Sequence, residues 1–103
     1  MKQVLLLIAT EHNKKAAKKI AISLLKKKLA ACISLKDIYS IYEWEGKIEE
    51  VYEVQIIIKS KPELKNALVV FLKNKISYDI PQIIYKEFNS ENKYTNWVNK
   101  SCL

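Results

Sequence analysis

The hydrophobic positions of the chain follow two different periods in its first thirty residues. Residues 3–10, QVLLLIAT, form a continuous apolar run, which is typical of a central strand buried on both faces. Residues 13–30 instead place apolar side chains at helical spacing, which predicts an amphipathic helix with Asn13 as its N-cap. Seven lysines mostly line its other side: Lys14, Lys15, Lys18, Lys19, Lys26, Lys27 and Lys28. The simplest interpretation of these lysines is a solvated helix face.

The single glycine of the chain lies in the segment YEWEGKIEEVYEV, residues 42–54. Glycine is favoured in two-residue hairpin turns because it adopts positive φ at little cost. A turn over Glu45 and Gly46 would place Trp44 opposite Lys47.

This register sorts the side chains of the hairpin onto two faces. On one face, Ile33, Leu35, Tyr39 and Ile41 would lie opposite Ile58, Ile56, Tyr52 and Glu50. On the other, Cys32, Lys36, Ile38, Tyr42 and Trp44 would lie opposite Lys59, Gln55, Glu53, Glu49 and Lys47. A slip of one residue would mix the mostly apolar face with the mixed one. We therefore expect residues 31–44 and 47–59 to form a long antiparallel hairpin.

A second helix is predicted over residues 60–75. Ser60 and Glu63 have the spacing of a capping box, and Pro62 lies where the first turn of a helix tolerates proline.

The C-terminal part of the chain predicts one more strand and a short helix. Residues 81–88 form the strand, with Pro81 at its first position, where a strand accepts proline. Residues 90–100 form the helix, capped by Ser90, and its inward positions are Tyr94, Trp97 and Val98. Cys102 lies beyond this helix, where chain ends commonly fray.

The order βαββαβ, followed by a terminal helix, predicts an α+β fold. We expect a ferredoxin-like antiparallel sheet with both main helices on one face, built as a single domain over residues 1–103. The hairpin strands are longer than the outer strands, so the hairpin tip should project beyond the sheet. It carries Tyr42, Trp44 and Ile48, and exposed aromatics on a projecting hairpin predict contact with another subunit.

The net charge of +7 first suggests nucleic acid, but all 18 basic residues are lysine. Arginine supplies most bidentate recognition of guanine and phosphate, so nucleic-acid binding is not the favoured function. No apolar run approaches the ~20 residues that span a bilayer, and the N-terminal run has no signal-peptide pattern. We therefore expect a cytoplasmic protein with no membrane partner, in which Cys32 and Cys102 remain reduced.

Catalytic signatures are scarce in this sequence. His12 is the only histidine, and the sequence does not place a nucleophile beside it. With one glycine there is no phosphate-binding loop, and no pair of residues has zinc-finger spacing. Five glutamates of the hairpin fit solvated strand residues, although hard-cation binding or acid–base chemistry is an alternative: Glu43, Glu45, Glu49, Glu50 and Glu53. We expect a protein that is not an enzyme.

Three segments resemble the CutA divalent-cation tolerance family. They are LAACIS (29–34), IYEWEGKIEEVYEVQIIIKS (41–60) and YDIPQIIYKEFNSENKYTNWVN (78–99). The resemblance implies a ferredoxin-like fold, a cytoplasmic homotrimer joined through the long hairpins, and a role in tolerance of copper and other divalent ions. It also implies a trimer like that of the PII nitrogen-signalling proteins. On that analogy the alternative function is a sensor that binds a small anionic ligand between subunits, through Lys59 and nearby tyrosines.

The resemblance also implies which residues gather in the cleft between subunits: Cys32, Tyr42, Trp44, Glu53, Lys59 and Tyr78. In the predicted register Cys32 faces Lys59, and a nearby lysine favours the thiolate form that binds soft metals. The alternative is a small buried thiol beside a salt-bridged lysine.

The metal ligands that the family suggests are replaced in this chain. Their positions correspond to Ala9, Lys75 and Gln82, of which alanine offers no donor and lysine repels cations. A divalent metal such as copper is therefore a candidate cofactor only through Cys32, His12 or the acidic hairpin.

Overall fold

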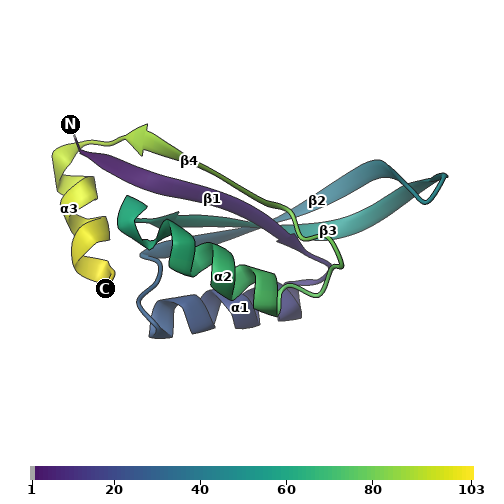
Figure 1. Ribbon diagram of the computed structural model, residues 1–103, viewed down its shortest axis with the longest axis horizontal. Coiled ribbons are helices and arrows are strands. Elements are labelled where there is room, and N and C mark those ends of the chain that lie inside the picture. The colour runs from purple at the N-terminus through teal and green to yellow at the C-terminus, as the bar shows by residue number, and fades with distance from the viewer. Residues whose placement is uncertain (1) are drawn as a thin grey trace.

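The computed structural model describes residues 2–103 and contains four strands, three helices and one short 3-10 turn (Figure 1). In chain order these are β1 (Gln3–Glu11), α1 (Lys14–Lys26), β2 (Cys32–Trp44), β3 (Lys47–Ser60), η1 (Pro62–Leu64), α2 (Lys65–Lys75), β4 (Ile83–Asn89) and α3 (Asn92–Ser101). The strands form one antiparallel sheet in the order β2-β3-β1-β4. This is the predicted α+β ferredoxin-like arrangement with an added terminal helix.

Helices α1 and α2 lie on the same face of the sheet, and the main core is between them and the central strands (Figure 1). Alternate residues of a strand point to one face, so Leu5 and Leu7 of β1 join Ile56 and Ile58 of β3 in this core. All four side chains are fully buried. Helix α3 packs at the opposite end of the sheet from the hairpin, where Val98 and Cys102 form a second small cluster with Val4 and Ala31.

The β2–β3 hairpin projects well beyond the rest of the sheet, and it gives the molecule its long dimension of 46 Å (Figure 1). Its register is the predicted one along its whole length, from Cys32 opposite Lys59 to Trp44 opposite Lys47. Glu45 and Gly46 both have positive φ, at 50° and 80°. The turn therefore has the left-handed backbone that matches the twist of the two strands.

Two predicted helix caps are wrong. Ser60 is the last residue of β3, and its hydroxyl donates to the Leu29 carbonyl at 2.7 Å. It therefore forms no capping box, and α2 instead begins after the 3-10 turn without a side-chain cap. Helix α3 is capped by Glu91 in place of Ser90, because the Glu91 carboxylate accepts from the backbone N–H groups of Lys93 and Tyr94.

Several predicted boundaries also shift. Helix α1 ends at Lys26, because Lys28 has φ 57° and the Leu29 N–H closes the turn on the Leu24 carbonyl. Strand β4 begins at Ile83, so Pro81 precedes the strand.

The C-terminal helix differs from its prediction in which side chains are buried. Val98 is buried as expected, but Tyr94 and Trp97 are exposed. Cys102 is buried and its thiol lies 3.6 Å from the Ser60 hydroxyl, so the end of the chain is packed and not frayed.

Candidate functional site

A groove of about 680 Å³ lies where the projecting hairpin leaves the body of the molecule. One wall is a face of the β2–β3 hairpin, and the other is the loop between α2 and β4. The lining residues are Thr10, Ile38, Ser40, Ile41, Tyr42, Trp44, Glu49, Glu53, Gln55, Ser77, Tyr78, Asp79, Ile80 and Gln82. The two halves of the site therefore come from segments far apart in the sequence.

Strand periodicity places the hairpin residues in this groove. Side chains two residues apart share a face, so Tyr42 and Trp44 point to the same side of β2. Tyr42 pairs with Glu49 across the hairpin, and Ile38 pairs with Glu53. Directly opposed residues of antiparallel strands have neighbouring side chains, so aromatic and carboxylate groups stand side by side on this face.

Tyr78 connects the loop to the hairpin. Its hydroxyl donates to the Glu53 Oε1 at 2.9 Å. Burial raises the pKa of Tyr78 well above its usual value, and the hydrogen bond to the Glu53 carboxylate raises the pKa further. Tyr78 therefore stays protonated and acts as a hydrogen-bond donor that holds Glu53 in place.

A second polar cluster holds the start of the same loop. The buried carboxylate of Glu11 accepts from the Ser77 N–H at 3.1 Å, the Ser77 hydroxyl at 2.5 Å and the His12 N–H at 3.0 Å. It also lies 2.8 Å from the His12 Nδ1. Burial alone would raise the pKa of Glu11, but hydrogen bonds from Ser77 and His12 outweigh burial and lower the pKa.

The Glu11–His12–Ser77 cluster brings a serine, a histidine and a carboxylate together, yet its geometry is not that of a catalytic triad. The Ser77 hydroxyl lies 2.9 Å from the His12 Nδ1, which is the same nitrogen that faces Glu11. In a triad the two ring nitrogens divide these roles, so that one accepts the serine proton while the other donates to the carboxylate. The cluster therefore serves as a clamp that joins the end of β1 to the loop carrying Tyr78.

Four of the six residues predicted for the cleft line the groove: Tyr42, Trp44, Glu53 and Tyr78. Cys32 and Lys59 face each other as predicted, but they do not line it. They lie six residues along β3 from Glu53, which is roughly 20 Å at ~3.3 Å per residue. In a single chain the predicted set therefore divides into a groove and a separate Cys32–Lys59 pair.

The residues at the expected metal positions do not fit a metal site. Ala9 is fully buried in the core and offers no donor, and Lys75 ends α2 with a positive charge. Gln82 lines the groove. Across residues 2–103, no three His, Cys, Asp or Glu side chains come together as a group that could hold a metal ion.

The charge of the groove is opposite to that of the whole protein. Glu49, Glu53 and Asp79 line it, whereas none of the lining residues is one of the 18 lysines. Carboxylates beside aromatic rings suit a cationic group better than an anionic one.

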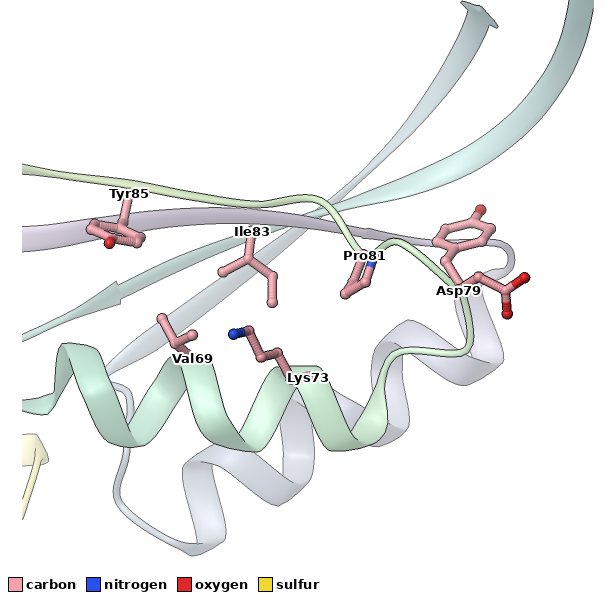
Figure 2. Close-up of a pocket in the computed structure, with 7 residues that line it drawn as sticks. Val69, Lys73, Asp79, Pro81, Ile83 and Tyr85 are labelled. Atoms are coloured by element: carbon pink, nitrogen blue, oxygen red, sulfur yellow. The ribbon is translucent and has the colours of Figure 1, made fainter. Parts of the chain in front are cut away.

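A second pocket, of about 550 Å³, lies between α2 and the segment that enters β4. Figure 2 shows the Lys73 side chain extending between Val69 of the helix and Ile83 of the strand, while Asp79 points away. Two charged residues line this pocket, Lys73 and Asp79, and of these only Lys73 extends into it, so the pocket offers less chemistry than the groove.

The sequence did not reveal the Glu11 clamp, which joins residues 66 positions apart. The one available signal was an acidic residue at the end of an otherwise apolar buried strand, a position where a carboxylate needs partners.

In residues 2–103, no helix is both long enough and apolar enough to cross a membrane.

Comparison with known proteins agrees with this fold. The sequence model of the CutA1 divalent ion tolerance protein family matches residues 5–101. The divalent-cation tolerance protein CutA of Yersinia pestis is 34% identical over 96% of this chain and 85% of its own length.

Two solved structures extend the comparison. CutA1 from Oryza sativa has a TM-score of 0.93 at 35% identity, covering 99% of this chain and 95% of its own. A periplasmic divalent cation tolerance protein CutA from Archaeoglobus fulgidus has a TM-score of 0.91 at 30% identity, covering 95% and 97%. With the same order of strands and helices and matches along nearly all of its length, this chain belongs to the CutA1 divalent ion tolerance protein family.

Proposed function

We propose that the protein acts in divalent-cation tolerance as a cytoplasmic homotrimer joined through its β2–β3 hairpins. Family membership supports the tolerance role. The homotrimer is inferred from the hairpin, which extends away from the core and leaves large apolar side chains exposed to solvent.

The uncovered side chains occupy both faces of the hairpin. They are Tyr39, Ile41, Tyr42, Trp44, Ile48 and Tyr52, and Tyr52 alone leaves 79% of its surface exposed. A two-stranded hairpin is marginally stable in water unless another element covers it. Exposed apolar patches of this kind mark protein interfaces, so a second and a third copy of the chain would supply the missing cover.

The groove lies where such a neighbour would pack. One of its walls is the hairpin, and Trp44 near the turn is 41% exposed. In the proposed trimer the groove becomes a cleft between subunits, and Tyr42, Trp44, Glu53 and Tyr78 belong to it.

The chemistry of the described residues argues against a metal centre at the expected positions within one chain. Ala9 and Lys75 cannot bind a cation, and Cys32 and His12 lie in different parts of the molecule. We therefore propose that the trimer contributes to tolerance indirectly and not by holding copper at the ligand positions of the family.

The alternative of a PII-like sensor for a small anion finds less support. Lys59, its expected anion-binding residue, is not among the residues that line the groove, and the groove itself is acidic. Thermal denaturation in the presence of nucleotides and metabolic acids tests this alternative, because a ligand that binds the folded state raises the midpoint.

Growth of a host strain without its own CutA protein tests the proposed function. We expect the wild-type gene to restore growth in added copper, and a Trp44→Ala hairpin variant to restore it less. Cys32→Ser should restore growth as well as the wild type, since the proposed role is indirect. Full rescue by Trp44→Ala together with loss of rescue by Cys32→Ser would contradict the proposal. Cell fractionation of the same strains tests the cytoplasmic location.

A further inference from the structure

The outer face of α1 concentrates the positive charge of the protein. Between Glu11 and Asp37 the chain contains eight lysines and no acidic residue. Helix α1 packs against the sheet through Ala17, Ile20 and Leu24. Its lysines therefore face away from the core, and those on the helix are exposed.

Two large apolar side chains lie among these lysines. Ile22 and Leu25 are 43% and 47% exposed, although a helix face that contacts only water is expected to carry polar side chains. Residues three and four positions apart are neighbours on a helix surface. Ile22 therefore has Lys18, Lys19 and Lys26 around it and Leu25 beside it.

The lysines of α1 have no anionic partner within the chain. In the part of the chain that the structure describes, the one ion pair within 4.0 Å joins His12 to Glu11. Six acidic residues lie on the β2–β3 hairpin, which projects away from the helix layer (Figure 1). The positive charge of α1 is therefore available to an external partner.

We propose that the outer face of α1 docks on an anionic phospholipid surface. The lysine ammonium groups would pair with lipid phosphates, while Ile22 and Leu25 enter the boundary between headgroups and acyl chains. Exposed apolar residues amid lysines are the composition of helices that lie in a membrane interface. Long lysine stems support this arrangement, because they can lie along apolar surface with the charge at the headgroups.

A lipid surface explains this face better than nucleic acid does. A phosphate backbone would use the lysines but offers no apolar phase to Ile22 and Leu25. The contact would be peripheral, since no helix in residues 2–103 could cross a bilayer. The expectation of no membrane partner was based on the length of apolar runs, which excludes a span and does not bear on a surface contact.

Vesicle co-sedimentation of the full-length protein tests the proposal. We expect binding to vesicles that contain phosphatidylglycerol, little binding to pure phosphatidylcholine, and partial release at high salt. Lys19→Gln with Lys26→Gln should weaken the partition by roughly 30-fold. The matched control is Lys93→Gln with Lys100→Gln on α3, which removes the same charge and should leave most of the binding.

The apolar contribution has its own variant pair. Ile22→Gln with Leu25→Gln should weaken vesicle binding by roughly 10-fold or more, whereas Val70→Gln, on the exposed side of α2, should not. Circular dichroism checks that each variant keeps its helix content. No binding to anionic vesicles, equal loss in both lysine pairs, or unchanged binding after Ile22 and Leu25 are replaced would overturn the proposal. Tighter binding to duplex DNA than to vesicles, unaffected by the apolar variant, would assign the face to nucleic acid.

Discussion

At the scale of single residues, Glu11 is the buried group with the most connections. Its carboxylate accepts hydrogen bonds from His12, which follows β1, and from Ser77, which lies in the loop after α2. Glu11 therefore joins the end of β1 to that loop. That loop continues directly into Tyr78, which donates to Glu53 in the groove. The position of the groove wall therefore depends on a carboxylate that does not itself line the groove.

Replacing Glu11 with glutamine should destabilise the protein. An amide has one accepting oxygen, so its NH2 group would face the donors on Ser77 and His12. Leaving buried donors unpaired costs about 1–3 kcal/mol. Urea unfolding at fixed protein concentration measures the change, with the exposed Glu87→Gln as a control that should stay within ~0.5 kcal/mol.

The same carboxylate predicts a pH dependence. Because the folded state lowers the pKa of Glu11 below its ordinary value of 4.5, its contribution is present above that pH. It is lost as the pH falls through the folded-state pKa. The midpoint of thermal unfolding should therefore fall less steeply below about pH 4.5 in Glu11→Gln than in the wild type. Equal acid slopes in the two proteins would mean that Glu11 does not control this window.

The hairpin turn gives a prediction about backbone conformation. A Cβ on Gly46 would meet nothing within 4 Å, so the cost of Gly46→Ala comes from its φ of 80° alone. We expect a loss of ~1 kcal/mol. Glu45→Asn should instead stabilise the turn by a few tenths of a kcal/mol, because asparagine tolerates positive φ. Thermal unfolding measures the change in stability of both variants. Equal changes would show that backbone strain at positive φ does not determine which residues suit this turn.

At the scale of elements, the hairpin was the most predictable part of the fold. Its register follows from one turn and from the separation of apolar and mixed faces, both of which are local in sequence. The order of elements and the side of the sheet on which the helices lie follow from the hydrophobic periods and the short connections.

Features that depend on distant contacts were not predictable. Ser60 has the residue type of a helix cap, but its hydroxyl is bonded to the distant Leu29 carbonyl. The cap of α3 was missed for a local reason, because the Glu91 carboxylate, one residue after Ser90, accepts from the Lys93 and Tyr94 N–H groups. Tyr78 meets Glu53 only because the loop after α2 returns to the hairpin. The split between the groove and the Cys32–Lys59 pair follows from the hairpin register, because Glu53 and Lys59 lie six residues apart on one face of β3. The resemblance, which groups residues between subunits, placed them in one cleft.

Trp44 predicts how the hairpin contributes to assembly. Truncating a large aromatic at the centre of an interface typically costs ~2 kcal/mol or more, which is roughly 30-fold in a dissociation constant. We expect Trp44→Ala to dissociate at a higher protein concentration than the wild type in sedimentation velocity. Val70→Ala removes an exposed apolar side chain from α2 and should leave the assembly unchanged. Equal resistance of both variants to dissociation would show that the hairpin is not the anchor.

At the scale of the whole molecule, the chain is elongated, and its acidic and basic residues are concentrated in different parts. The radius of gyration is 14.4 Å, compared with about 13 Å for a compact domain of this length. The excess reflects the hairpin, which carries acidic residues away from the lysine-rich helix layer (Figure 1). One chain thus presents an uncovered apolar hairpin, an acidic groove and a basic helix face, and in the proposed trimer neighbouring copies would cover the hairpin.

Native mass spectrometry of the purified protein, without and with copper under reducing conditions, tests both the proposed trimer and its indirect role. It reports the number of subunits and the bound metal in the same spectrum. We expect a trimer that remains free of copper, because no group of ligands in the described part of one chain is arranged to hold it. A monomer would contradict the assembly through the hairpins. A trimer that takes up a defined number of copper ions, and loses them in Cys32→Ser, would contradict the indirect role.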